Sequence, residues 1–414
     1  MLMSKMIKKV SLFPIYFVLF LDNFGFAVIF ATFGPLFDNP DYGMVSAATS
    51  GTTRNIMLAF SLAIFPLGQF FGSPFLGDIA DRFGRKKAFY ITIAAETLGY
   101  VLSGISIYTH SYSFLLFSRL ITGFFAGNLS ICLASIADLS PNEAKRSKNF
   151  SFIVIVTGIS WMVAMLMGGY LSDPSISSSF NPALPFFVTA VFSALSLLAI
   201  AYMFKETRPT TEKFHINLAK GFQNIIDTLH IKELRILYVV YFFWIFGWGL
   251  AFQWFSPYSL QVFKATILQV TWGQFLFGTT WMIGGYFINN MLVKRFHARQ
   301  IVVVGTAITT IILFCMAVST NYIWFTILMG LACFPAAFSW PNTLNLISMN
   351  APEEIQGKIM GISQSSMSVG FILATLLGGL LGSVGLKGLY FCSGILLFIT
   401  WLLLFRHHRR KATK

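Results

Sequence analysis

The 414-residue sequence contains very little charge. Asp, Glu, Lys and Arg together make up 11% of it, against about 25% in soluble globular proteins, while hydrophobic residues make up 56%. So few charged side chains cannot cover the surface of a soluble protein of this length. The composition therefore excludes a soluble multidomain protein and predicts a polytopic membrane protein.

Cysteine and histidine are also scarce. The four cysteines all lie within apolar stretches without paired spacing, and the six histidines show no HxxxH or other metal-ligand spacing. No GxxxxGK[ST] phosphate-binding loop occurs, which argues against ATP-driven pumping by this chain. We therefore expect no disulfide framework, no metal ion and no cofactor.

Long apolar runs are what the sequence has in abundance. A helix needs about 20 mostly apolar residues to cross the hydrocarbon core, and these runs are continuous, without the alternation of barrel strands. The sequence predicts an all-α fold. We expect twelve transmembrane helices over about 12–36, 56–76, 88–108, 112–137, 150–171, 183–204, 236–257, 268–290, 300–319, 322–347, 358–382 and 387–405.

Lys and Arg are distributed unequally between the two sides of these spans. With the N-terminus inside, 25 of the 29 basic residues fall on the cytoplasmic side, three fall on the other side, and Arg119 lies within a span. The net charge of +14 is therefore a topology signal, and we expect no nucleic-acid partner. We expect the protein in the plasma (inner) membrane, with both termini in the cytoplasm.

The two halves of the sequence resemble each other. Residues 140–152 align with residues 351–363 at an offset of 211, and residues 79–87 align with residues 292–300 at an offset of 213. Two matches at nearly one offset indicate an internal duplication. Duplicated six-helix halves are a transporter architecture, with the substrate site between them near the middle of the membrane.

The longest polar interruption separates six predicted spans from the next six. We therefore predict an N-terminal six-helix bundle over residues 1–204, a cytoplasmic linker over residues 205–235, and a C-terminal bundle with a short basic tail over residues 236–414.

A signature motif follows the second predicted span. GDIADRFGRKK, residues 77–87, resembles the G-x-x-x-D-R-x-G-R-K motif of the major facilitator superfamily. Residues 21–35, 119–128 and 204–207 are similar to the corresponding parts of its drug and tetracycline exporters. The resemblance implies twelve helices in two pseudo-symmetric bundles. It also implies a monomer that moves a small organic molecule and protons across the lipid bilayer, with no enzymatic activity.

The resemblance also implies a gate at this motif. The family counterpart of Asp81 faces the start of span eleven, where a helix N-terminus favours a carboxylate. We expect Arg85 to pair with Asp138, and Glu353 and Glu354 to meet the basic residues 85–87. Glycines at 72 and 77 are expected to allow close helix approach. The expected gating residues are Gly77, Asp81, Arg82, Gly84, Arg85 and Asp138.

Ionisable residues inside the spans are few. Asp22 lies ten residues into span one and Arg119 seven residues into span four. A charge at a helix centre costs about 2.5–3.5 kcal/mol on insertion scales, so each is a functional candidate. We expect Asp22 to carry the coupling proton and Arg119 to be its partner or an anion contact; a static buried pair is the alternative. Glu96, in span three, is expected to pack against a polar neighbour or to reach the surface, and its part in coupling stays open.

The C-terminal half offers polar and aromatic side chains within its spans. In span ten we expect Pro335 and Pro341 to interrupt the helix, as interrupted helices often line binding cavities. Polar residues are stronger cavity candidates than tryptophans, because exposure to lipid would penalise them. The candidates for the substrate cavity are Asn128, Trp248, Gln253, Asn342, Asn345 and Gln364.

These features favour a proton-coupled secondary transporter of a small amphipathic or neutral organic molecule. The resemblance to exporters favours efflux. Uptake of a nutrient, amino acid, nucleoside or siderophore is the alternative, because Ala164 and Met165 stand where proton-antiporting members carry Gly-Pro. A membrane enzyme would need a cluster of His and acidic residues, and a transport-dead sensor would need additional soluble sequence. Neither feature is evident.

Overall fold

The computed structural model describes residues 12–140, 143–207, 232–350 and 356–412, for some of which the backbone alone is described. This part of the chain is helical, without strands. The helices are α1 (Phe13–Asp38), α2 (Gly51–Phe83), α3 (Arg85–Tyr108), α4 (Tyr112–Phe125), α5 (Asn128–Asp138), α6 (Glu143–Ser172), α7 (Leu184–Met203), α9 (Lys232–Gln253), α10 (Phe255–Val262), α11 (Ile267–Met282), α12 (Asn289–Leu292), α13 (Ala298–Ala317), α14 (Tyr322–Met349), α15 (Gln356–Val384) and α16 (Leu389–Ala412), with short 3-10 helices η2 (Pro40–Tyr42) and η5 (Leu386–Gly388) and a π-helix, η3 (Ile283–Ile288).

Within the described ranges, ten helices are long and apolar enough to cross a membrane. Three of the predicted spans are interrupted. Span four consists of α4 and α5, which part at Ala126 and Gly127. Span seven consists of α9 and α10, which part at Trp254, and span eight consists of α11, η3 and α12. Each predicted span thus corresponds to one or more helices, and the prediction of an all-helical multi-pass fold is confirmed.

Glycine, and not proline, marks two of the breaks in the helices. The prediction that Pro335 and Pro341 interrupt span ten is wrong, because α14 runs unbroken with both prolines inside it. A transmembrane helix tolerates proline where neighbouring groups satisfy the freed carbonyls. Two of the interruptions fall instead beside Gly127 and in the π-helix that contains Gly284 and Gly285.

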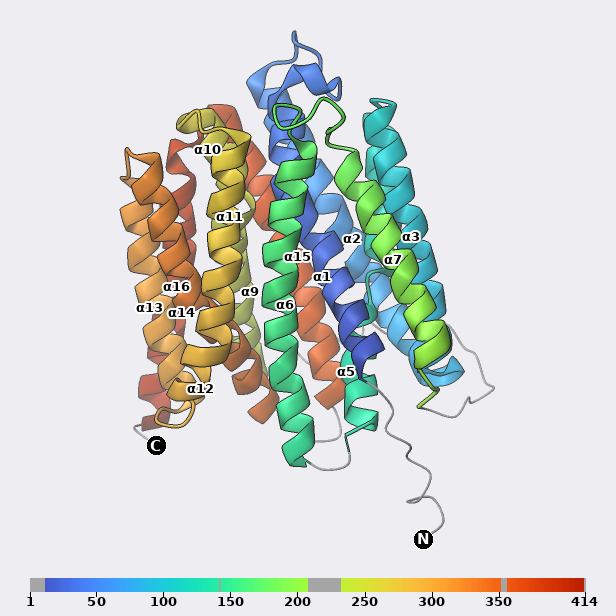
Figure 1. Cartoon of the computed structure of the whole chain (residues 1–414). Coiled ribbons are helices and arrows are strands. Elements are labelled where there is room, and N and C mark those ends of the chain that lie inside the picture. The colour runs from blue at the N-terminus through green and yellow to red at the C-terminus, as the bar shows by residue number, and fades with distance from the viewer. Residues whose placement is uncertain (1–11, 141–142, 208–231, 351–355, 413–414) are drawn as a thin grey trace.

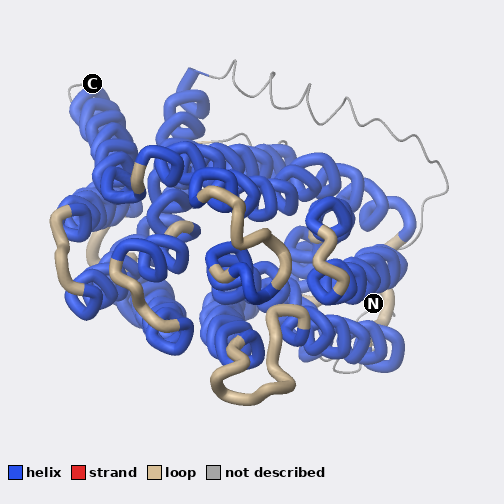
Figure 2. The backbone as a smooth tube through the Cα atoms, turned by 90° about the horizontal axis from the view of Figure 1, so that it is seen from above, coloured by secondary structure: helices blue, strands red, loops and turns tan. Residues whose placement is uncertain are grey.

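The helices before residue 204 and those after residue 231 lie side by side (Figure 1). α3 and α7 form one edge of the molecule, and α13, α14 and α16 form the other. Between these edges, α2 packs against α15 and α6 packs against α11, so these helix pairs join the two halves. Figure 2 shows from above that the connecting segments lie at the ends of the helices.

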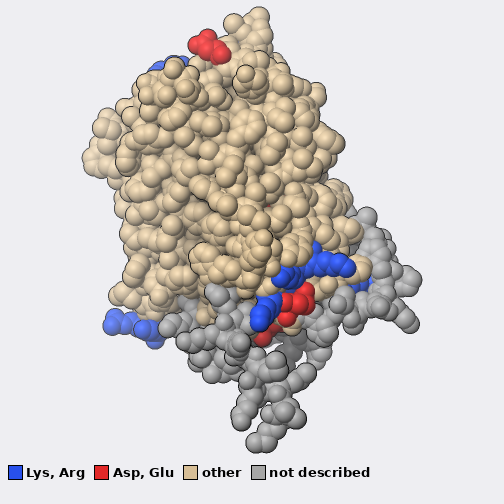
Figure 3. Space-filling view, turned by 45° about the vertical axis from the view of Figure 1, so that its right-hand side comes forward, with Lys and Arg blue, Asp and Glu red and all other residues tan. Residues whose placement is uncertain are grey.

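On the surface, charged side chains lie at the two ends of the helices. Figure 3 shows a broad band of surface without Lys, Arg, Asp or Glu between the two ends. An apolar band of this kind is what the hydrocarbon core of a bilayer requires. We call the end that carries the α2–α3 junction at Gly84 the Gly84 face, and the opposite end, which carries Asn55 near the start of α2, the Asn55 face.

Close packing of α2 on α4 depends on glycine. A Cβ atom at Gly72 would lie 1.7 Å from the backbone oxygen of Phe124, and one at Gly123 would lie 2.1 Å from the backbone oxygen of Phe65. Neither position admits a side chain unless the two helices separate. At Gly77, no described atom lies within 4 Å of such a Cβ. The close approach expected at Gly77 is therefore not made by the described residues in this conformation.

The substitution Gly72→Ala is expected to lower the unfolding temperature of the purified protein. The added methyl group forces α2 and α4 apart, and overpacking of this kind costs about 1–3 kcal/mol. Gly77→Ala is the matched control, because it makes the same change on the same helix at a position where no described atom lies within 4 Å of the added methyl group. Thermal unfolding in detergent measures both variants, and equal unfolding temperatures would contradict the packing described.

Candidate functional site

A cavity of about 170 Å³ lies between the two halves. Among the described residues of its wall, Asp22 of α1 is the one ionisable side chain. The remaining wall is mostly apolar, and a few polar groups interrupt it, as in ligand sites generally. These polar residues are Asn23, Gln69, Thr157, Gln274 and Gln364.

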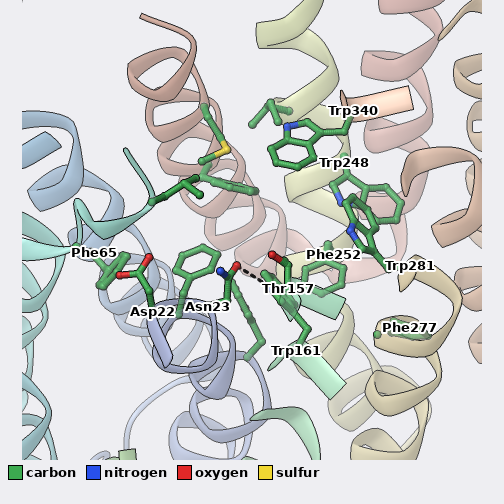
Figure 4. A pocket seen from close by; sticks show the side chains of 18 of the residues that line it. Asp22, Asn23, Phe65, Thr157, Trp161, Trp248, Phe252, Phe277, Trp281 and Trp340 are labelled. Atoms are coloured by element: carbon green, nitrogen blue, oxygen red, sulfur yellow. Dashed lines mark hydrogen bonds between the residues drawn. The ribbon is translucent and has the colours of Figure 1, made fainter. Parts of the chain in front are cut away.

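Aromatic rings form much of the cavity wall. The ring centroids of Trp248 and Trp281 lie 5.7 Å apart, and those of Trp281 and Trp340 lie 6.5 Å apart. Figure 4 shows these three tryptophans on the side opposite Asp22, with Trp161 between the two sides. Such a wall presents flat apolar surfaces and electron-rich ring faces, which suit an aromatic, amphipathic ligand.

Two of the six residues predicted for the cavity lie in its wall, namely Trp248 and Gln364. Asn128 is fully buried behind the wall and is linked to the cavity through its hydrogen bond to Asp22. The prediction missed the rings of Trp161 and Trp281, because a ring that faces a cavity and a ring that faces lipid look alike in sequence.

The other three predicted cavity residues lie away from the cavity. The buried Gln253 accepts a hydrogen bond of 2.8 Å from Thr375. The Asn342 amide donates to Asn289 Oδ1 at 2.7 Å, and Asn345 is exposed. The two buried amides are satisfied within the C-terminal half, so a polar residue inside a span need not face the substrate.

A second carboxyl group, that of Glu96, lies behind Asp22. Asn128 Nδ2 donates to Asp22 Oδ1 at 3.2 Å and to Glu96 Oε2 at 2.9 Å. Thr92 donates to Asn128 Oδ1 at 2.5 Å, which fixes the orientation of the amide. The two carboxyl groups are also within hydrogen-bond reach of each other. Glu96 is 3% exposed, so it packs against a polar neighbour and does not reach the surface.

The interruption of span four places Asn128 in this cluster. α4 ends at Phe125 and α5 begins at Asn128, so the first turn of a new helix lies beside the two carboxyl groups. A helix N-terminus carries partial positive charge and favours a carboxylate. Gln69 donates to the Ala126 carbonyl at 3.1 Å, which satisfies a backbone oxygen at the break.

Arg119 is not bonded to Asp22, its expected partner, by any hydrogen bond or ion pair within the described chain. The fully buried guanidinium lies 4.7 Å from the ring centroid of Phe65 and 5.9 Å from that of Phe186. Its nitrogen atoms have no hydrogen-bond partner among the described residues. The carboxyl group that acts on it electrostatically is that of Glu96, because α3 packs directly against α4.

On the Gly84 face, the motif makes contacts within the first half. Arg85 Nε lies 3.5 Å from Asp138 Oδ2. The Glu206 carboxylate, which follows α7, accepts hydrogen bonds from the backbone N–H groups of Arg85 (2.8 Å) and Lys86 (3.0 Å), and so caps α3. Gly84 has φ of 92°, a conformation that favours glycine, and a Cβ there would lie 2.4 Å from Glu206 Oε2.

The rest of the motif is placed less fully. Asp81 and Arg82 lie in the last turn of α2. The side chain of Asp81, and the whole of Glu353 and Glu354, lie outside the described residues. The expected contacts between the motif and the start of span eleven therefore stay a prediction.

On the Asn55 face, polar side chains join the two halves. Gln261 Nε2 donates to Asn55 Oδ1 at 2.9 Å, and Asn55 Nδ2 donates to Gln261 Oε1 at 3.3 Å and to the Gly382 carbonyl at 3.2 Å. Asp38, at the end of α1, lies near the Gln261 amide and the Lys264 ammonium group. These contacts hold the two halves together on this face.

The sequence matches the Major Facilitator Superfamily over residues 12–289 and 237–414. The chain belongs to this superfamily. It is therefore a multi-pass membrane transporter and not an enzyme.

Two curated relatives of this major facilitator protein are resistance proteins. The tetracycline resistance protein, class B, of Escherichia coli is 22% identical over 371 residues, which cover 83% of this chain and 85% of the relative. The quinolone resistance protein NorA of Staphylococcus aureus is 23% identical over 366 residues, which cover 86% of this chain and 88% of the relative.

Solved structures of the same superfamily share the fold. The human organic anion transporter MFSD10 has a TM-score of 0.72 and 19% identity, covering 96% of this chain and 99% of its own. The xylose transporter XylE of Escherichia coli has a TM-score of 0.73 and 16% identity, and the match covers 95% of this chain and 97% of XylE. At these identities the likeness establishes the architecture alone.

The substitution Gln364→Leu is expected to weaken binding of an aromatic amphipathic ligand about two- to tenfold, the value of one hydrogen bond. Ethidium is a suitable probe, with quenching of the cavity tryptophans as the measurement. Gln253→Leu is the matched control, since it makes the same change in the same half but away from the cavity. Equal dissociation constants for the two variants would show that the cavity is not the binding site.

Proposed function

We propose that this major facilitator protein is a proton-coupled secondary transporter that exports an amphipathic aromatic molecule. The observation that carries the proposal is Asp22, the one ionisable side chain among the described residues of an otherwise apolar and aromatic cavity. A carboxyl group that a central cavity reaches is able to bind or release a proton as the cavity fills and empties. Occupancy by substrate is thereby coupled to protonation.

The arrangement of the halves supports transport by alternating access. We infer that the Gly84 face is cytoplasmic, because most Lys and Arg residues lie on that side of the spans. In the described conformation, Asn55 and Gln261 close the opposite face. Rocking of the halves about the cavity would break these contacts and expose the site to the outside.

Efflux is the favoured direction because two relatives are resistance proteins, for tetracycline and for quinolones. Proton-driven uptake of a nutrient is the second candidate. Ala164 and Met165 favour uptake, because they stand where proton-antiporting members carry Gly-Pro. The helix α6 continues through these two residues without a break. Both directions use the same cavity, and the sign of the driving gradient distinguishes them.

Flux into proteoliposomes tests the function and its direction. Antiport predicts that vesicles with an acidic lumen accumulate substrate, whereas symport predicts accumulation when the lumen is alkaline. Tetracycline, a quinolone and ethidium form the first substrate panel. Absence of flux under either gradient with this panel and with nutrient classes would contradict the proposed function.

The substitution Asp22→Asn is expected to reduce gradient-driven accumulation at least tenfold, because the amide cannot exchange a proton. Asp41→Asn is the matched control: it makes the same change at an exposed residue of η2 on the Asn55 face, and should leave accumulation unchanged. Undiminished accumulation in the Asp22 variant would eliminate the coupling role of this carboxyl group.

A further inference from the structure

Glu96 is a buried acid that the proposed function leaves unused. It lies on α3, outside the cavity wall, and one of its carboxyl oxygens, Oε1, has no hydrogen-bond partner among the described residues. It nevertheless shares the Asn128 amide with Asp22 and lies within hydrogen-bond reach of it. A buried acid placed directly behind the proton-binding group requires a physical explanation.

The charges around the pair allow one carboxylate and not two. Among the described residues, the titratable groups that face it are Tyr100 on α3, Arg119 on α4 and Cys132 on α5. Arg119 supplies one positive charge, while the tyrosine and the cysteine are neutral when protonated. Two carboxylates this close in a medium of low dielectric constant repel each other strongly, so such pairs hold one proton between them.

The position of the two acids indicates which one retains the proton. Asp22 lies in the wall of a cavity that has room for water molecules. Glu96 lies behind it, 3% exposed, among helices of the first half. Charge is less costly beside the cavity than behind it, so the group that changes charge is Asp22. A protonated Glu96 also supplies the O–H donor that a hydrogen bond between two carboxyl groups requires.

We propose that Glu96 is a positioning residue that stays protonated through the transport cycle and donates a hydrogen bond to Asp22. Asp22 then exchanges its proton with the cavity alone, and the Glu96 hydroxyl and the Asn128 amide stabilise its carboxylate when that proton has left. This inference rests on the proposed function, because it assigns a role within the same coupling site.

Two substitutions at position 96 separate a hydrogen-bond donor from a proton carrier. Glu96→Gln keeps a donor and cannot ionise, so proton-driven ethidium accumulation is expected to stay within about twofold of the original protein. Glu96→Leu has a similar volume and no donor, so accumulation is expected to fall at least tenfold. Exchange of ethidium across vesicles without a pH gradient should persist in both variants, because the cavity wall is unchanged.

The opposite results would overturn the inference. If Glu96→Gln loses accumulation as completely as Asp22→Asn, Glu96 itself exchanges a proton. If the Glu96→Leu variant accumulates ethidium normally, the Glu96 side chain has no positioning role. If Glu96→Leu loses gradient-free exchange as well, its effect is a structural one on the whole fold.

Infrared spectroscopy tests the protonation state without any substrate. At neutral pH the purified protein is expected to show the C=O band of a protonated buried carboxyl group, which Glu96→Gln removes and the control Asp41→Asn retains. Absence of this band overturns the inference even if transport is observed. If the band is present but no proton-driven flux occurs, the proposed function fails and the coupling role of Glu96 fails with it, while its protonated state stands.

Discussion

The Asn128 amide holds together the polar cluster to which we assign proton coupling. It donates to an acid on α1 and to an acid on α3, and a threonine fixes its own orientation. Burial of two acids is costly unless such a network satisfies them. Asn128 is the first residue of α5, so the start of this helix after the break in span four lies beside acids of α1 and α3.

The hydropathy of the sequence was sufficient to predict the fold class and to identify Asp22 and Arg119 as buried charged residues. It could not identify their partners, because partners depend on how each helix is rotated about its axis. α3 packs against α4, which brings the Glu96 carboxyl group close enough to Arg119 to interact with it electrostatically. The spacing of residues within one span cannot predict such a contact between two helices. The sequence could not identify the aromatic cavity for the same reason, since the same residue types face lipid and face a cavity.

The two faces of the molecule are joined in different ways. On the Asn55 face, side chains of α2 and α10 bond directly across the boundary between the halves. On the Gly84 face, the described contacts of Arg85 run to Asp138 at the end of α5 and to Glu206, which follows α7. In the described conformation, side-chain hydrogen bonds therefore join the two halves on the Asn55 face.

The Glu206 cap has a mechanical consequence. It fixes the start of α3 to the end of α7, and Arg85 ties the same point to the end of α5. Three helix ends are thus joined at one point, and none of the residues that make these bonds belongs to the second bundle. We expect these three helix ends to move together, so that the positive charges of Arg85 and Lys86 keep their positions relative to the first bundle.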